Sequence, residues 1–136
     1  MFECLILGDS IGLGAAKAIN ERYARHCDVQ AVERATAAQI LRWRKPDKSY
    51  GSCVFAMGSN DAPGASLART LYRIRGSICF RRVIWLLPYA RTQAYVVSSV
   101  AARYGDETVD LIRFATVDHI HPRSYSQLAS ALLRRP

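Results

Sequence analysis

The sequence predicts an α/β fold, in which a doubly wound parallel sheet of about five strands lies between two layers of helices. One observation behind this prediction is that short apolar runs alternate with longer segments whose apolar residues recur at helical spacing. Another is that the first apolar run, residues 2–7, is nearly continuous and ends at Gly8, which is typical of a strand buried on both faces. Because strand–helix–strand crossovers are right-handed, the alternation gives a three-layer α/β/α sandwich.

The remaining elements follow in order from the same two patterns. Further strands are expected where short apolar runs end at a glycine, a proline or a polar residue, at 29–32, 53–57, 82–87 and 108–111. Helices are expected where apolar residues recur three or four positions apart, at 11–26, 36–43, 67–74, 92–104 and 125–134. Residues 44–52 are polar and contain Pro46 and Gly51, which predicts a loop. No linker or internal repeat is evident, so we expect one domain over residues 1–136.

The amino-acid composition limits the kinds of partner that this chain is expected to bind. The chain has 136 residues, with 19 Lys or Arg against 11 Asp or Glu, and a formal net charge of +8. Arginine carries most of this excess, with clusters at 42–45, 69–75 and 81–82, and it favours bidentate contacts with phosphate or carboxylate. The basic surface is therefore either a solvated surface or one that attracts an anionic polymer. Wholesale disorder is excluded, and no apolar run reaches the roughly 18 residues of a membrane span.

The four cysteines are far apart and form no CxxC pair, which argues against a zinc knuckle or a redox motif. Cys4 and Cys53 fall in predicted buried strands, so we expect buried, reduced thiols, with a disulfide as the alternative. No signal peptide is visible at the N-terminus, which predicts a cytoplasmic protein and leaves release by a non-classical route open.

Three polar motifs stand after predicted strands or before a helix. Gly8-Asp9-Ser10 follows the first strand, Gly58-Ser59-Asn60-Asp61 follows the third, and residues 118–122 precede the last helix. Taken singly, the first two fit helix caps and turns, and the third fits a loop with exposed histidines. In a sheet of order 2-1-3-4-5, however, the first and third strands are neighbours at the edge where doubly wound folds bind ligands. Ser10 and Asn60 would then face one crevice.

These residue types suit nucleophilic chemistry. Ser10 would stand at a helix N-terminus, whose partial positive charge favours a developing alkoxide, and the Asn60 amide can donate to a carbonyl oxygen. Asp118 precedes His121 by three residues, so its carboxylate can accept from Nδ1–H and leave Nε2 free as a base. His119 is the competing base.

The three motifs resemble blocks I, III and V of the SGNH (GDSL) hydrolases, and the resemblance spans essentially the whole chain. The family is a flavodoxin-like α/β/α sandwich of esterases, lipases, thioesterases and carbohydrate acetylesterases. The resemblance implies that Ser10 is the nucleophile, His121 the general base and Asp118 its orienter. It also implies that the Ser10 N–H and the Asn60 side chain donate to the oxyanion. This mechanism needs no metal and no cofactor.

The chain departs from the family at the second block, where the family has a glycine whose N–H is a further oxyanion donor. Residues 32–37 contain no glycine, and Arg34 is the best match to that position. Arg34 can supply an N–H with ordinary backbone dihedrals, but a positive φ there would cost energy. Residues 83–88 are similar to the family's fourth strand, whose following loop often borders the site. We therefore predict Tyr89 and Arg91 as substrate contacts, with loop packing as the alternative.

The chain is shorter than most family members and has no evident lid insertion, so an open, shallow site for short acyl groups is expected. The sequence thus predicts a serine ester hydrolase acting on short acyl esters, including acetyl groups on glycans, with thioesters as further candidates. Its expected partners are a small-molecule or glycan-borne ester and an anionic polymer. Neither a membrane span nor nucleic-acid binding is expected. The alternative is a non-catalytic polyanion-binding module with a degenerate oxyanion hole.

Overall fold

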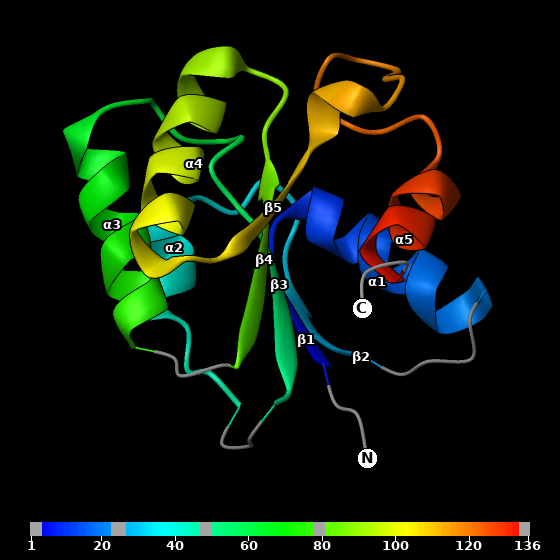
Figure 1. The fold of residues 1–136 in the computed structure, drawn as a ribbon, viewed down its shortest axis with the longest axis horizontal. Helices are drawn as coiled ribbons and strands as arrows, with labels where there is room; N and C mark the ends of the chain where they lie inside the picture. Colours follow the sequence, from blue (N-terminus) through cyan, green and yellow to red (C-terminus); the bar gives the residue numbers. More distant parts are fainter. Residues whose placement is uncertain (1–3, 23–26, 47–49, 78–80, 134–136) are drawn as a thin grey trace.

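The computed structural model describes residues 4–22, 27–46, 50–77 and 81–133. Within these residues, five parallel strands form one sheet in the order β2-β1-β3-β4-β5 (Figure 1). The strands are β1 (Cys4–Gly8), β2 (Cys27–Ala31), β3 (Ser52–Ala56), β4 (Arg82–Leu87) and β5 (Glu107–Asp110). The helices are α1 (Ser10–Arg22), α2 (Ala37–Arg42), α3 (Ala65–Gly76), α4 (Arg91–Tyr104) and α5 (Tyr125–Leu133), with a 3₁₀ turn, η1, at Leu111–Arg113. The predicted fold class is confirmed, and the strand order is the one under which the sequence places Ser10 and Asn60 at one crevice.

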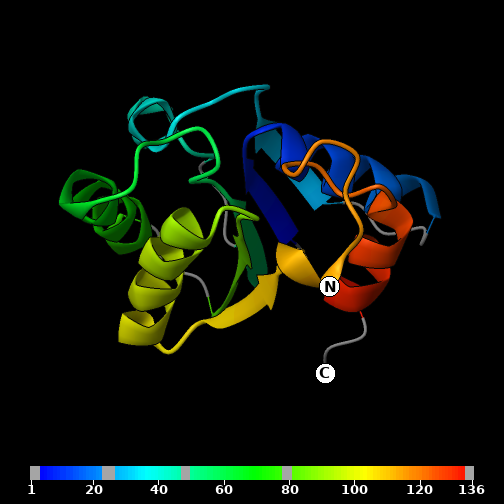
Figure 2. The same ribbon diagram turned by 90° about the horizontal axis from the view of Figure 1, so that it is seen from above.

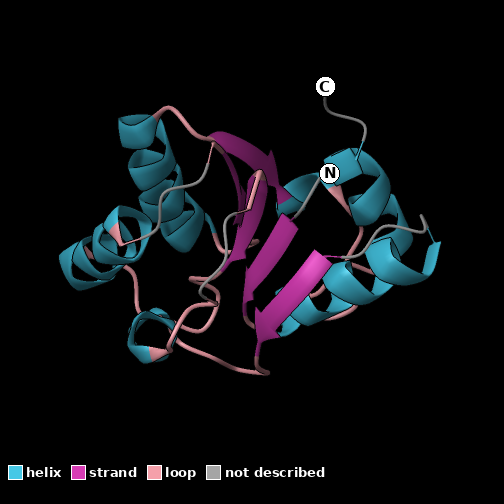
Figure 3. Cartoon of the chain, turned by 90° about the horizontal axis from the view of Figure 1, so that it is seen from below, coloured by secondary structure: helices cyan, strands magenta, loops and turns pink. Residues whose placement is uncertain are grey.

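The helices divide into two layers (Figures 2 and 3): α2, α3 and α4 cover one face of the sheet, and α1 and α5 cover the other. Successive residues of a strand therefore enter different cores. Leu5 and Leu7 of β1 pack with α2–α4, whereas Ile6 packs with α1 and α5. Both faces of β1 and β3 are covered, which explains why their sequences are apolar without alternation.

Several predicted boundaries shift. The first helix was expected to run to residue 26; α1 is described as far as Arg22, and residues 23–26 lie outside the described part. The second strand was expected to start at residue 29, but β2 begins at Cys27. The fifth strand ends at Asp110 instead of residue 111, because the Asp110 carboxylate accepts from the N–H of Ile112 (3.1 Å) and begins η1. No helix in the described ranges is long and apolar enough to cross a membrane.

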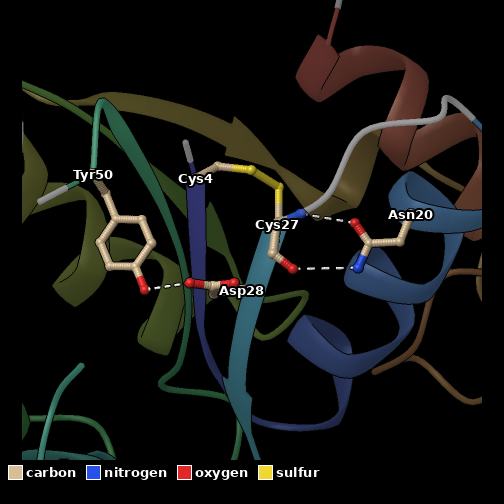
Figure 4. The surroundings of a disulfide bond; sticks show 5 residues. All are labelled: Cys4, Asn20, Cys27, Asp28 and Tyr50. Atoms are coloured by element: carbon tan, nitrogen blue, oxygen red, sulfur yellow. Dashed lines mark hydrogen bonds between the residues drawn. A yellow bond between two sulfur atoms is a disulfide. The ribbon is translucent and has the colours of Figure 1, made fainter. Parts of the chain in front are cut away.

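The expectation of reduced thiols is wrong for two cysteines, because Cys4 and Cys27 form a disulfide (Figure 4). The two residues are register partners on the neighbouring strands β1 and β2, with their Cα atoms 4.7 Å apart. Asn20 of α1 supports Cys27 on both sides: its Oδ1 accepts from the Cys27 N–H (2.9 Å), and its Nδ2 donates to the Cys27 carbonyl (3.3 Å). A crosslink over a separation of 23 residues stabilises the fold by about 3 kcal/mol in the chain-entropy picture.

Cys53 is buried and free, as expected, and Cys79 lies outside the described residues. The cytoplasmic location stays a prediction. The disulfide does not favour it, since such bonds are rare in reducing compartments.

Candidate active site

The carboxyl end of β1 places Ser10 at the start of α1. Gly8 is needed there, because a Cβ on it would lie only 1.9 Å from the Ala56 carbonyl oxygen of β3. The close approach lets the Asp9 N–H donate to that oxygen (2.9 Å), and the chain then turns into the helix. The Asp9 carboxylate caps α1 by accepting from the N–H of Ile11 (3.0 Å). Ser10 is thereby held at the positive end of the helix dipole.

The structure brings Ser10, His121 and Asp118 together in one chain of hydrogen bonds. Ser10 Oγ lies 2.7 Å from His121 Nε2, and His121 Nδ1 lies 2.7 Å from Asp118 Oδ2. Because Asp118 can only accept, Nδ1 carries the hydrogen, and Nε2 is left to accept from the serine hydroxyl. The backbone N–H and the imidazole of His121 lower the pKa of Asp118 to about 2. The orienting carboxylate is therefore ionised over the whole physiological range.

A tight loop after η1 carries the histidine and its carboxylate. Thr116 and Pro122 form an isolated antiparallel bridge, and the His121 carbonyl accepts from the N–H of Val117 (3.3 Å). At the tip, Asp118 Oδ1 accepts from the N–H of His121 (2.7 Å), and His119 adopts a left-handed φ of 63°. The loop thus turns His121, and not the neighbouring His119, toward Ser10.

The second sequence block forms a turn with a left-handed residue. The Ala35 N–H donates to the Val32 carbonyl (3.2 Å), so residues 32–35 make a β-turn, and Arg34 at its third position has a φ of 62°. A single positive φ at that position defines a type II turn, which normally takes glycine or asparagine. An arginine there costs about 1 kcal/mol. Arg34 therefore has the positive φ that, by the argument from the sequence, costs energy at this position.

Asn60 lies beside that turn. Its Nδ2 donates to the Ala35 carbonyl (3.1 Å) and lies 3.5 Å from Asp9 Oδ2. The loops that follow β1, β2 and β3 therefore meet around Asn60, as the strand order requires. Asp61 strengthens this junction, because its carboxylate accepts from the Ala37 N–H at the start of α2 (3.0 and 3.1 Å). The Asp61 carbonyl also accepts from the Gln93 side chain of α4 (3.0 Å).

Asp9 and Asp61 are the residues that sequence reasoning undervalued, since both were interpreted only as turn or cap residues. Asp9 is almost fully buried, and burial raises its pKa to about 6, although nearby N–H groups and His121 favour the charged form. Burial also raises the pKa of Asp61. Their position, one residue before Ser10 and one after Asn60, was the available signal.

Tyr89 and Arg91, predicted to contact substrate, both have partners within the protein. The Tyr89 hydroxyl donates to the Phe114 carbonyl (2.7 Å), and Arg91 forms a two-pronged pair with Asp110 (2.9 and 3.0 Å). These bonds tie the loop after β4 to the segment that leads into the histidine loop. The alternative, loop packing, describes what they do in this structure, and their contact with substrate stays a prediction.

Neither a protein-family profile nor a curated protein matches this sequence. Solved structures do match. The native aryl esterase of M. smegmatis superposes with a TM-score of 0.70 at 9% identity, covering 98% of this chain and 99% of that one. The fold is that of GDSL-type hydrolase structures. A GDSL-like lipase from Bacteroides thetaiotaomicron agrees (TM-score 0.69, 16% identity, 97% of this chain and 85% of that one).

A further match is a two-domain esterase active on acetylated mannans, with a TM-score of 0.67 at 15% identity. It covers 98% of this chain and 48% of that one, so this chain corresponds to about half of that esterase.

Proposed function

We propose that this protein is a serine ester hydrolase that works through an acyl-enzyme on Ser10. The observation that carries the proposal is the continuous hydrogen-bond chain from Ser10 Oγ through His121 to Asp118, with both links at 2.7 Å. This arrangement has the three roles of a hydrolytic triad: a nucleophile, a base within reach of its proton, and a group that fixes the base. The esterase structures that share the fold support the same reaction class.

The proposed reaction has two halves. As Ser10 Oγ attacks the ester carbonyl, its proton moves to His121 Nε2, and the imidazolium is stabilised by Asp118. Collapse of the tetrahedral intermediate breaks the bond to the alcohol, which leaves with the proton from His121, and the acyl group stays on Ser10. Water then attacks the acyl-enzyme with His121 again as base, releasing the acid and restoring the serine hydroxyl.

The oxyanion would be held by donors from the three loops that meet at Asn60. The Ser10 N–H is at the N-terminus of α1, and the left-handed turn supplies the N–H of Arg34. One N–H of Asn60 is engaged by Ala35, whereas the 3.5 Å separation from Asp9 is too long for a strong bond. That second N–H is the one that we assign to the oxyanion.

Exposure of the triad favours short acyl groups and esters displayed on large carriers. The side chains of His121 and Asp118 are 33% and 46% exposed, and Asn60 is also exposed. An open site gives a long acyl chain little apolar surface to bury, whereas it admits an acetyl group on a polymer. Acetyl esters on glycans, small aryl or alkyl esters and thioesters are therefore the substrate classes that we propose.

The deciding experiment compares p-nitrophenyl acetate hydrolysis by the wild type and Ser10→Ala. Ser99→Ala is the matched control, because Ser99 is an exposed α4 residue that bonds the Tyr95 carbonyl of its own helix. We expect turnover in the wild type and the control and none above background in Ser10→Ala. Labelling by a fluorophosphonate should follow the same pattern. Equal turnover in Ser10→Ala would overturn the proposal, and a folded but inactive wild type would favour the non-catalytic module.

A further inference from the structure

The outer face of α3 and α4 carries a groove away from Ser10. It consists of two open hollows of about 550 and 420 Å³ that both include Tyr72 in their lining. We call this surface the α3–α4 groove and define it by its lining residues: Ser66, Arg69, Thr70, Tyr72, Arg73, Arg103 and Tyr104. Figures 1 and 2 show α3 and α4 side by side, on the opposite side of the sheet from α1 and α5.

The groove is strongly basic, and its charge is not neutralised within the described part of the chain. Arg69, Arg73 and Arg103 are exposed, and among the described residues no ion pair joins any of them to a carboxylate. The acidic residue near the foot of the helices, Asp106, is already engaged. Its carboxylate pairs with Arg75 (2.7 and 3.0 Å) and also accepts from the Trp85 indole (2.9 Å). The three arginines are therefore available to an external anion.

The arrangement of the arginines fits a polymer with an anion on its repeating units. Arg69 and Arg73 are one helical turn apart on the same face of α3, about 6 Å from each other along it, and Arg103 lies across Tyr72 on α4. A single small anion would need the guanidinium groups to converge on one point. Guanidinium groups pair with carboxylate and phosphate alike, so the anion by itself does not separate polysaccharide from nucleic acid.

The aromatic residues favour polysaccharide. Proteins that bind single-stranded nucleic acid stack bases on open aromatic faces. Here the rings of Tyr72 and Tyr104 are tilted by 43° with centroids 6.2 Å apart, and the Arg75 guanidinium covers the Tyr104 ring at 4.7 Å. The two rings engage each other and Arg75, which leaves no parallel slot between the rings for a base. Recognition in this groove therefore depends on charge, and the two tyrosines line the groove without stacking on the ligand.

The groove leads toward the catalytic edge. Ser66 is in the first turn of α3, and that helix follows the loop that contains Asn60 and Asp61. We propose that the α3–α4 groove binds an acidic polysaccharide, a polymer with carboxylates on its sugars, and presents its O-acyl groups to Ser10. The hydroxyls of such a polymer are natural sites of acylation. Delivery to Ser10 rests on the proposed function, whereas binding in the groove does not.

The binding test uses polygalacturonate as the probe. The variant Arg69→Gln/Arg73→Gln/Arg103→Gln removes three charges from the groove. The control Lys17→Gln/Arg44→Gln/Arg113→Gln removes three charges from exposed residues elsewhere. We expect the groove variant to bind at least about tenfold more weakly than the wild type and the control to stay within about threefold, with affinity falling as salt rises. A neutral galactan should not bind.

Three results would overturn this inference: an equal loss of affinity in the control, no binding of polygalacturonate by the wild type, or tighter binding of poly(dT) than of polygalacturonate.

Measurements of esterase activity separate this inference from the proposed function. We expect both triple variants to hydrolyse p-nitrophenyl acetate like the wild type, and the groove variant alone to lose about tenfold in kcat/KM on acetylated polygalacturonate through a higher KM. If the wild type shows no esterase activity but the groove variant still binds polygalacturonate more weakly, the proposed function is wrong and the proposed binding site is supported.

Discussion

The two halves of the candidate site differ in how completely they are built. On one side, Ser10, His121 and Asp118 are joined by hydrogen bonds of 2.7 Å, and a braced loop holds them. On the other side, an arginine is in a left-handed turn and Asn60 donates to a backbone carbonyl instead of pointing freely into the site. The hydrogen-bond chain of the proposed triad is therefore complete, whereas the proposed oxyanion side is where this chain departs from the expected pattern.

The largest expected effect is on the triad side. His121→Ala removes the proposed base, whose imidazole contacts Ser10, so kcat/KM on p-nitrophenyl acetate should fall by roughly 10³–10⁴. His119→Ala is the matched control and should stay within about threefold, because the loop turns His121 and not His119 toward Ser10. A comparable loss in both variants would show that the loop as a whole, and not one imidazole, determines activity.

Next in size is the effect of removing the Asn60 amide. Asn60→Ala deletes one proposed oxyanion donor, and kcat should fall by roughly 10²–10³ with little change in KM. The same change breaks the bond to the Ala35 carbonyl, so the free energy of unfolding has to be measured beside the kinetics. Asn60→Asp tests the chemistry further, since a carboxylate accepts but does not donate. Activity retained in Asn60→Asp would contradict the role assigned to the amide.

Asp9 lies between the two halves, and its titration makes the free energy of unfolding depend on pH. Its pKa is about 6 in the folded protein against an ordinary value of 3.8, so between these values the folded state holds a proton that the unfolded chain has lost. Its contribution to stability is therefore greatest at low pH and is lost as the pH rises through 6. Relative to Asp9→Asn, the wild type should gain about 2 kcal/mol between about pH 7.5 and about pH 4.5.

Urea unfolding of both proteins at the two pH values measures this difference. Asn is the suitable replacement because its carbonyl oxygen can still accept from the Ile11 N–H and cap α1. A difference between the two proteins that does not change with pH would show that Asp9 titrates near its ordinary value.

The fold was predictable because its decisive signals are local. β1 and β3 are apolar runs ended by glycine, and the alternation of strands and helices allows few topologies. The disulfide was not predictable in the same way. Extending the first helix to residue 26 and starting the second strand at residue 29 placed Cys27 outside the sheet. Its pairing with Cys4 depends on β2 starting two residues earlier.

In the candidate site, too, the features that local sequence signals encode were predictable and those that depend on loop packing were not. Ser10, Asp118 and His121 could be predicted from the sequence because each falls in a short motif next to a predicted element, and the strand order places the loops that carry Ser10 and Asn60 at the same edge of the sheet. The burial of Asp9 and the engagement of Asn60 by Ala35 depend on how three loops pack, which no single segment encodes. The left-handed turn was foreseen only as a condition, because Val32-Glu33-Arg34-Ala35 contains neither of the residues that such a turn favours.

The smallest expected effect tests that turn. Arg34→Gly removes the steric cost of a φ of 62°, about 1 kcal/mol, and keeps the backbone N–H. Glycine's greater freedom in the unfolded chain offsets part of this gain, so the free energy of unfolding should rise by about 0.5 kcal/mol or less while kcat/KM stays within about threefold. Glu33→Gly, one residue earlier and without a positive φ, is the matched control and should destabilise the protein, because there glycine only increases the freedom of the unfolded chain. If both glycines destabilise equally, the left-handed position costs nothing. If Arg34→Gly is stable but tenfold less active, the guanidinium itself acts on the substrate, and an arginine in place of glycine at this position contributes to specificity.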